Sequence, residues 1–187
     1  MDNTKQLSEV PKLETERLIL RKIILDDARD IFEYAHVPEV SEFLIWYPHQ
    51  TIQDSINFIK FAEDKFVNNE WIIFGIELKE KSKLIGTIDI RGWKEVNNCA
   101  ETGYVISKAY WNKGITTEAL RAVIKFCFEE LQSNRLEAHC EEENIGSWHV
   151  MEKCGMKYEG TLREKVYIKE KYRSMKMYSI LRSEYKK

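Results

Sequence analysis

The segment that follows Gly114 has one apolar face at helical spacing, and this amphipathic helix constrains the fold more than any other feature. Its opposite face carries Arg121, Lys125 and Glu129. β-rich runs lie before it, at residues 99–106, and after it, at 135–140. A helix between two strands of one sheet returns the chain to its starting end, so this order predicts a parallel βαβ crossover. The apolar face consists of Leu120, Val123, Ile124, Cys127, Phe128 and Leu131.

The remaining β-rich runs are separated by short polar turns, which is typical of antiparallel neighbours. With the crossover, they predict an α/β (α+β) fold with a mixed central sheet, mostly antiparallel and with one parallel pair. The expected strands are a first strand at 17–21, a meander of 71–78, 84–90 and 99–106, and a terminal hairpin of 158–168 with 172–181.

Capping signals predict three more helices, which makes about four in total. Asp26 is the expected N-cap of the first. Thr51 and Asp54 are spaced as in a capping box and open the second. The last covers residues 147–154 and ends at Gly155.

The domain organisation follows from length and patterning. The chain has 187 residues, enough to bury a core within one domain. The first residues are polar and show no periodicity. We therefore expect a flexible leader over residues 1–12 and a single domain over 13–187.

The balance of charge argues against some classes of partner. Lys and Arg total 29 against 31 for Asp and Glu, a net charge of -2, so nothing draws the whole chain to nucleic acid or anionic lipid. The first residues lack the basic and apolar segments of a secretion signal, and no apolar run approaches the ~20 residues that span a bilayer. We expect a cytoplasmic protein.

The cysteines point to neither a disulfide framework nor a metal site. They form no Cys-x-x-Cys pair and have no histidine at zinc-binding spacing. His139 and Cys140 are neighbours on an expected strand, so their side chains point to opposite faces and cannot chelate together. We expect no metal and reduced, mostly buried thiols, with no visible partner to activate a nucleophilic cysteine.

The start of the amphipathic helix has the properties of an anion site. Residues 112–117 place free backbone N–H groups at the positive end of the helix dipole, and Gly114 lets the backbone approach a ligand closely. Lys113 adds a positive charge. An ordinary helix entry with a turn glycine is the alternative. No Walker-type or dinucleotide-binding glycine motif is present, so a different diphosphate is expected.

Several separated segments, in order from about Leu13 to Glu184, carry a family resemblance. The chain resembles the GNAT superfamily, specifically its RimJ/RimL-like branch of ribosomal-protein N-terminal acetyltransferases. The matching segments are ETERLILR at 14–21, ETGY at 101–104, YWNKGITTEAL at 110–120, Asn144 with Ser147, EKCGM at 152–156, EGTLR at 159–163, and residues 178–184.

The resemblance implies a GNAT-type fold with a V-shaped gap in the sheet and acetyl-CoA as the cofactor. The backbone of Tyr104, Val105 and Ile106 would pair with the pantetheine amides. Asn144 would hydrogen-bond the pantetheine arm, although it is also a natural helix N-cap. Lys153 would lie near the cofactor or be solvated. The pyrophosphate would lie on Asn112, Lys113, Gly114, Ile115, Thr116 and Thr117.

Two positions in this loop depart from the family's pattern. Thr116 stands where the family usually has Gly or Ala, and Asn112 where this branch usually has Gly. We expect a tighter loop or extra side-chain hydrogen bonds, with the backbone donors retained.

Acetyl transfer needs a neutral amine, yet an α-amino group titrates near ~8 and a lysine near ~10.4, so a base or a water path must remove a proton. Glu101 is the first candidate, because GNAT enzymes often use an acidic residue on this strand. An outward, solvated glutamate is the alternative. His139 is the second candidate, since histidine ordinarily titrates near ~6.5, although a lone histidine on a strand is commonly structural.

The departing thiolate needs a proton, and Ser147 resembles the serine proposed as the acid in this branch. Its alternative is plain capping of the helix that it opens. Another branch uses a tyrosine seven residues after the asparagine, where this chain has Met151. A backbone N–H near Val105 or Ile106 is expected to stabilise the oxyanion.

The resemblance implies a primary amine as acceptor, in the first place the α-amino group of a protein N-terminus, attacked directly in a ternary complex. A polyamine or aminoglycoside-like amine is the alternative, and a non-catalytic acyl-CoA sensor is a third reading. A monomer and a homodimer stay open. By family analogy an aromatic wall borders the acceptor groove, with ordinary packing as its alternative: Phe43, Trp46, Tyr47, Pro48, His49 and Trp93.

Overall fold

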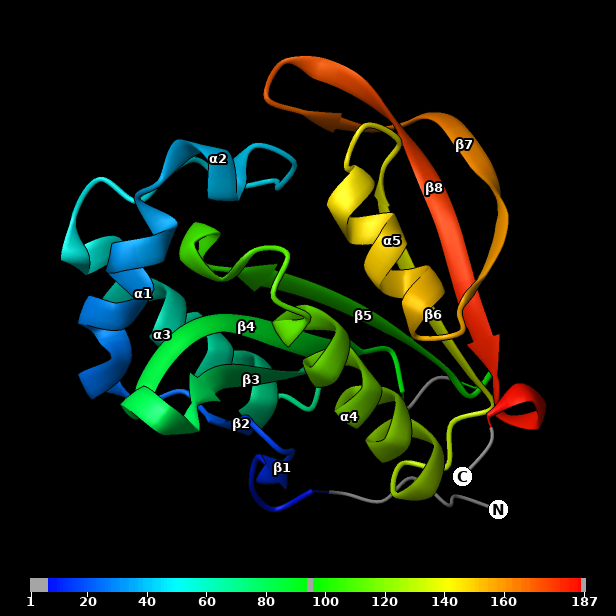
Figure 1. Cartoon of the computed structure of the whole chain (residues 1–187), viewed down its shortest axis with the longest axis horizontal. Helices are drawn as coiled ribbons and strands as arrows, with labels where there is room; N and C mark the ends of the chain where they lie inside the picture. Colours follow the sequence, from blue (N-terminus) through cyan, green and yellow to red (C-terminus); the bar gives the residue numbers. More distant parts are fainter. Residues whose placement is uncertain (1–6, 94–95, 186–187) are drawn as a thin grey trace.

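One eight-stranded sheet runs through the molecule (Figure 1). The structure is a computed structural model that describes residues 7–93 and 96–185. The strand order is β1-β2-β3-β4-β5-β6-β8-β7, and among these residues only β5 and β6 pair in parallel, as the sequence predicted. The strands are β1 (Leu13–Glu14), β2 (Leu18–Lys22), β3 (Trp71–Leu78), β4 (Lys83–Arg91), β5 (Cys99–Ile106), β6 (Arg135–Glu141), β7 (Lys157–Ile168) and β8 (Lys171–Leu181).

Helices cover both faces of this sheet (Figure 1). The four longer helices match the predicted ones. The short helix α2 was missed, since four residues are too few to show a helical period. α4 and α5 lie on one face, and α1 and α3 pack against β3 and β4 on the other. The helices are α1 (Ala28–Ala35), α2 (Pro38–Ser41), α3 (Ile52–Val67), α4 (Ile115–Glu129) and α5 (Ile145–Lys153).

The structure confirms some of the predicted helix caps and contradicts another. The capping box of α3 is confirmed, with the Asp54 carboxylate accepting the backbone N–H of Thr51 at 2.9 Å. Asp26 is wrong as the cap of α1, because a 3₁₀ turn at Leu25–Asp27 comes first and Asp27 takes the N-cap position. Gly155 ends α5 with φ of +82°.

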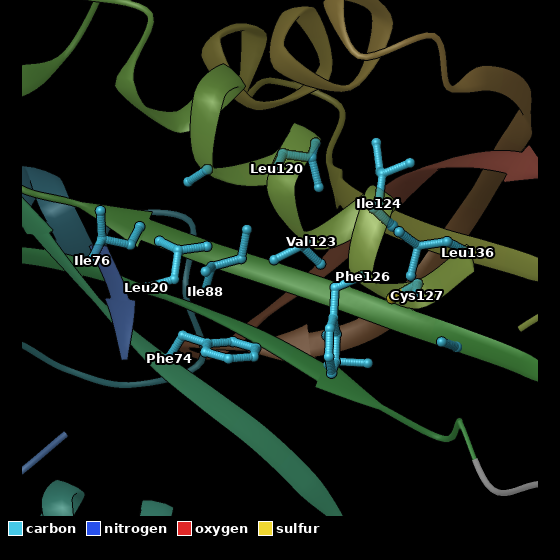
Figure 2. Packing of buried hydrophobic residues seen from close by; sticks show 14 of the residues in the cluster. Leu20, Phe74, Ile76, Ile88, Leu120, Val123, Ile124, Phe126, Cys127 and Leu136 are labelled. Atoms are coloured by element: carbon cyan, nitrogen blue, oxygen red, sulfur yellow. The ribbon is translucent and has the colours of Figure 1, made fainter. Parts of the chain in front are cut away.

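The main hydrophobic core lies between α4 and the sheet (Figure 2). The apolar face predicted for α4 is buried there, with Leu120, Val123 and Cys127 fully buried. Phe126 packs edge-on against Phe74 of β3, with ring centroids 6.1 Å apart. These contacts fix the crossover helix to the sheet.

β5 and β6 part soon after they meet. Their parallel pairing covers only three residue pairs and ends at Glu101 and Glu137. β5 stays paired to β4 as far as Ile106, and β6 stays paired to β8 as far as Glu141. Beyond Glu101, within the described residues, no strand pairs with the edge of β5 that faces β6. The V-shaped gap expected from the family resemblance is therefore present, with its vertex at Glu101.

Part of the expected leader at residues 1–12 lies outside the described residues, at 1–6. Leu7 and Val10, which follow, pack against the main core. No helix among residues 7–93 and 96–185 is long and apolar enough to cross a membrane.

Gly86 gives a direct test of the β4–β5 pairing. A Cβ at this position would collide with the carbonyl oxygen of Val105 and lie 3.0 Å from the Ile106 Cα. We expect Gly86→Ala to lower the free energy of unfolding by roughly 1–3 kcal/mol, because backbone atoms cannot easily move aside. Urea denaturation measures this. Gly146→Ala is the control and should not destabilise the fold, since the nearest atom to its Cβ lies 3.9 Å away. Equal stability of the Gly86→Ala protein would contradict the close approach of the two strands.

Candidate active site

The loop before α4 forms the predicted anion cradle. Gly114 is the N-cap of α4 with φ of +72°, and no side chain caps it among the described residues. The backbone N–H groups of the first helical turn have no acceptor within the helix. Asn112 has φ of +60°, a left-handed conformation that asparagine tolerates better than most residues, which explains why it can replace glycine here. The loop therefore presents unpaired donors, as a diphosphate requires.

Arg17, 96 residues before Lys113 in the sequence, stabilises this loop. Its guanidinium donates to the Lys113 carbonyl at 3.0 Å and to the Glu118 carboxylate at 2.6 Å. Thr15 also donates to Glu118. Burial raises the pKa of Glu118, but the hydrogen bonds from Thr15 and Arg17 outweigh it and leave the pKa below its usual value. Glu118 is thus ionised, and Arg17 balances a charge that would otherwise repel an anion.

A first cavity of about 620 Å³ is lined by the end of β5, the first turn of α4 and the residues of α5. Most predicted site residues line it. Lys113 and Glu101 do not, and the Lys113 amine instead lies 5.4 Å from the centre of the Tyr110 ring. The predicted residues that line it are Tyr104, Val105, Ile106, Asn112, Gly114, Ile115, Thr116, Thr117, Asn144, Ser147 and Lys153.

At the α5 end of this cavity, two hydroxyl groups meet. Asn144 caps α5, since its side-chain oxygen accepts the Ser147 N–H at 3.1 Å. Ser147 therefore does not serve as the N-cap. Its hydroxyl lies 3.1 Å from the hydroxyl of Tyr104, which also donates to the Ser147 carbonyl. Burial raises the pKa of Tyr104, so its phenol is protonated at neutral pH. Sequence reasoning missed this pair because no local pattern links positions 43 residues apart.

The free edge of β5 is partly occupied by a neighbouring side chain. The indole N–H of Trp111 donates to the Ile106 carbonyl at 3.0 Å. Of the three predicted pantetheine-binding residues, Ile106 therefore has its carbonyl already engaged, while Tyr104 and Val105 lie nearer the vertex.

Glu101 lies at the vertex, on the opposite face of the sheet from the main core. One of its oxygens is 2.7 Å from Arg91 Nη2 and 2.9 Å from His139 Nδ1. Its side chain is 32% exposed and contacts Arg91 and His139 rather than projecting freely into solvent. Burial raises the pKa of Glu101, but the His139 hydrogen bond and the Arg91 charge leave it below the usual value. Nearby on β4, burial raises the pKa of Asp89 to about 7 despite the charge of Arg91.

A second cavity of about 810 Å³ lies on the Glu101 side of the vertex. β5 contributes to both cavities, with residues 99–101 lining this one and 104–106 lining the first. Both acidic and basic side chains form the walls, together with two tryptophans. Its main lining residues are Trp71, Arg91, Trp93, Cys99, Glu101, Arg135 and Glu137.

The expected aromatic wall does not exist as one unit. Phe43 lines the first cavity, whereas Trp93 is buried and lines the second. Trp46 packs against the core under α1 and α3, and His49 bonds Ser55 of α3 at 2.9 Å. Tyr47 is 65% exposed. Packing therefore accounts for Trp46 and His49.

The β7–β8 hairpin extends toward α2 (Figure 1). Lys169 at its tip donates to the Ser41 carbonyl at 2.5 Å and lies 5.4 Å from the Tyr47 ring centre. The hairpin turn has positive φ at both Lys169 and Glu170, a conformation that glycine and asparagine usually supply, and it forms here without either.

The thiols are reduced, as expected. All four cysteines are free, and burial raises the pKa of Cys99, Cys140 and Cys154 to about 11. Such thiols are protonated at neutral pH and are poor nucleophiles. Within the part of the chain that the structure describes, no group of His, Cys, Asp or Glu side chains could hold a metal ion.

Residues 17–157 match the acetyltransferase (GNAT) domain family. The chain belongs to this family. GNAT acetyltransferases take the acetyl group from acetyl-CoA, and the open N-terminus of α4 suits its diphosphate. The cofactor assigned from the sequence is therefore confirmed, and so is the enzyme class.

Similar proteins differ in the acceptors they are named for. The uncharacterized N-acetyltransferase p20 of Bacillus licheniformis is 32% identical, over 92% of this chain and 97% of its own length. The structure of a Vibrio cholerae protein with the proposed activity of a ribosomal-protein-serine acetyltransferase has a TM-score of 0.84 and 27% identity, covering 94% of this chain and 99% of that one. Spermidine N(1)-acetyltransferase of Vibrio cholerae is 28% identical over 60% of this chain and 64% of its length.

The cradle can be tested with two glycines of similar conformation. Gly114→Ala and Gly155→Ala each force a side chain into positive φ, at a cost of roughly 1–2 kcal/mol. We expect the Gly114 variant to bind coenzyme A about tenfold or more weakly, measured by isothermal titration calorimetry, because its loop leaves the binding conformation. The Gly155 variant should lose similar stability and keep its affinity. Equal affinities in both variants would show that this loop does not bind the diphosphate.

Proposed function

We propose that the chain transfers the acetyl group of acetyl-CoA to the α-amino group of a protein N-terminus, by direct attack in a ternary complex. The similarity to the Vibrio cholerae protein with proposed ribosomal-protein-serine activity supports this acceptor class. The arrangement of the two cavities around one strand supports the direct route, because donor and acceptor can approach the vertex from opposite faces of the sheet.

The mixed charge of the second cavity is the observation that carries the proposal. Arg91 and Arg135 lie there beside Glu70, Glu101 and Glu137. A peptide presents both N–H donors and carbonyl acceptors, so it can use walls of both kinds. A polyamine offers only N–H donors, so it would use the carboxylates and make no contact with the two guanidinium groups. The cavity of about 810 Å³ also exceeds what a single amine group needs.

The groups around the vertex have the chemistry that this reaction needs. The thioester of acetyl-CoA supplies an activated acetyl group. A backbone N–H on the unpaired edge of β5, near Val105, stabilises negative charge on the carbonyl oxygen. The paired hydroxyls of Tyr104 and Ser147 provide a proton for the thiolate. The Glu101–His139 pair accepts the proton of the amine.

A small amine is the second candidate acceptor. Glu39, Glu42 and Glu143 line the first cavity and would attract a cation. The relation to spermidine N(1)-acetyltransferase also favours it. Because these carboxylates border the other cavity, the two candidates make different predictions about which cavity wall controls the acceptor.

We also place the protein in the cytoplasm. Its four cysteines are free thiols, as in a reducing compartment. A disulfide in protein isolated from cells under thiol-blocking conditions would contradict this location.

An acceptor panel tests the proposed function. Release of coenzyme A thiol is followed with acetyl-CoA and peptides that begin with Ser, Ala or Thr, with the same peptides blocked at the N-terminus, and with spermidine and an aminoglycoside. We expect turnover of the free peptides and none of the blocked ones. A kcat/KM for spermidine above that of every peptide would contradict the peptide acceptor.

Cys99 allows the second cavity to be filled without touching the first. Its side chain is half-buried and lines the second cavity. Cys99→Trp should raise the KM for the peptide at least about tenfold, since the larger side chain occupies acceptor space, while the Kd for acetyl-CoA stays the same. Cys99→Ala is the matched control and should change neither value. An unchanged peptide KM in Cys99→Trp would place the acceptor elsewhere.

A further inference from the structure

The vertex of the sheet holds a histidine and a carboxylate in direct contact. Glu101 is the last residue of β5 that pairs with β6. On β6, alternate residues share a face, so His139 is the first residue beyond the Glu101–Glu137 pair to share the face of Glu101. The 2.9 Å contact between them therefore bridges the two strands at the point where they part.

This contact fixes which imidazole nitrogen is basic. An ionised carboxylate can only accept hydrogen bonds, so Nδ1 of His139 carries the hydrogen in the contact with Glu101. In the neutral ring, Nε2 then holds the free lone pair. The His139 side chain is 33% exposed, and Nε2 has no hydrogen-bond partner within the described part of the chain. A third of the side chain is exposed, so the ring can be reached from solvent beside the vertex, although His139 lines neither of the two cavities.

Glu101 itself is poorly placed to take a proton. Its Oε1 already lies within hydrogen-bonding distance of Arg91 and His139. Both contacts stabilise the charged carboxylate, which lowers its basicity. A carboxylate that orients a histidine in this way has a positioning role, as in catalytic triads.

Charged groups of both signs surround His139 on this face of the sheet. β4 contributes Asp89 and Arg91 to this face, and β5 contributes Glu101. On β6, Glu137 is bonded to Arg135, and on β8 the residue opposite His139 is the uncharged Met177. Two carboxylates against one guanidinium leave a negative field, so an imidazolium makes this cluster neutral when Asp89 is ionised.

We propose that Nε2 of His139 is the base that deprotonates the acceptor amine, and that Glu101 is a positioning residue that holds the ring through Nδ1. The proposal deepens the proposed function and applies to any amine that reaches the vertex. The ammonium group gives one proton to Nε2, and the neutral nitrogen forms the C–N bond as the C–S bond breaks. The acetylated nitrogen loses its second proton to solvent, the thiolate takes one proton from the Tyr104–Ser147 hydroxyls, which solvent replaces, and His139 returns its proton to solvent.

Two isosteric variants separate the roles of these residues. His139→Asn keeps a donor where Nδ1 lies but has no base, and we expect kcat to fall roughly 10²–10⁴-fold at neutral pH. In the wild type, kcat/KM should fall at low pH for two reasons, protonation of the enzyme's base (the enzyme's acidic limb) and protonation of the substrate amine near ~8. His139→Asn should lose the fall caused by the enzyme's base and keep the one caused by the amine. Glu101→Gln should lower kcat less and move the enzyme limb to lower pH, because removing a negative charge makes the imidazolium easier to deprotonate.

A direct titration provides a readout independent of turnover. The NMR signal of the His139 ring should titrate in the free protein with the same midpoint as the acidic limb, and this midpoint should fall in Glu101→Gln. Acetyl-CoA affinity should be unchanged in both variants. If His139→Asn lacks a native fold, His139→Ala replaces it, and added imidazole should then restore activity. A structural role for His139 would give no such rescue.

The opposite pattern would overturn the proposal. If Glu101 is the base, Glu101→Gln loses the acidic limb and His139→Asn keeps it. The kinetics use whichever amine the acceptor panel shows to be turned over, so a wrong acceptor class appears in that panel, and a wrong base appears in the pH profiles.

Discussion

The parting of β5 and β6 after three residue pairs is the constraint on which the rest of the site depends. A parallel pair that continued to Ile106 would satisfy the edge of β5 and close the sheet. Because β6 turns away with β8, that edge stays open and residues 104–106 of β5 line the first cavity. The gap stays open because the main core packs α4 against residues of both β5 and β6.

Different contacts hold the two ends of this gap in place. At the open end, the first turn of α4 offers unpaired N–H groups, and Arg17 holds that turn through Lys113 and Glu118. At the closed end, Glu101 and His139 join the two strands. An acetyl donor that spans the gap is thus bound by backbone donors at one end and meets titratable side chains at the other.

Periodicity and capping revealed much of the fold from the sequence. The apolar face of α4 between two strands was enough to predict the crossover, and the Thr51 capping box marked the start of α3. Both signals are local, since they join residues a few positions apart. The short helix α2 carries no such signal, and Asp26 resembled a cap because nothing in the sequence marks the 3₁₀ turn that precedes α1.

The sequence identified most residues of the candidate site, but it did not reveal which of them contact one another. The cradle residues and Ser147 came from a resemblance whose segments span nearly the whole chain. That Arg17 braces the cradle, that Tyr104 bonds Ser147, and that Glu101 contacts His139 depend on tertiary packing between distant positions. Lys113 is the reverse case, a residue whose charge suggested a ligand contact. Its side chain lies against Tyr110 in the structure.

A crystal structure with bound coenzyme A tests the central claim most directly. The account predicts a diphosphate on the backbone N–H groups of residues 115–117, pantetheine along β5 at Tyr104 and Val105, and the thiol at the vertex beside Glu101 and His139. Coenzyme A bound outside the gap, or a gap closed by continued β5–β6 pairing, would contradict it.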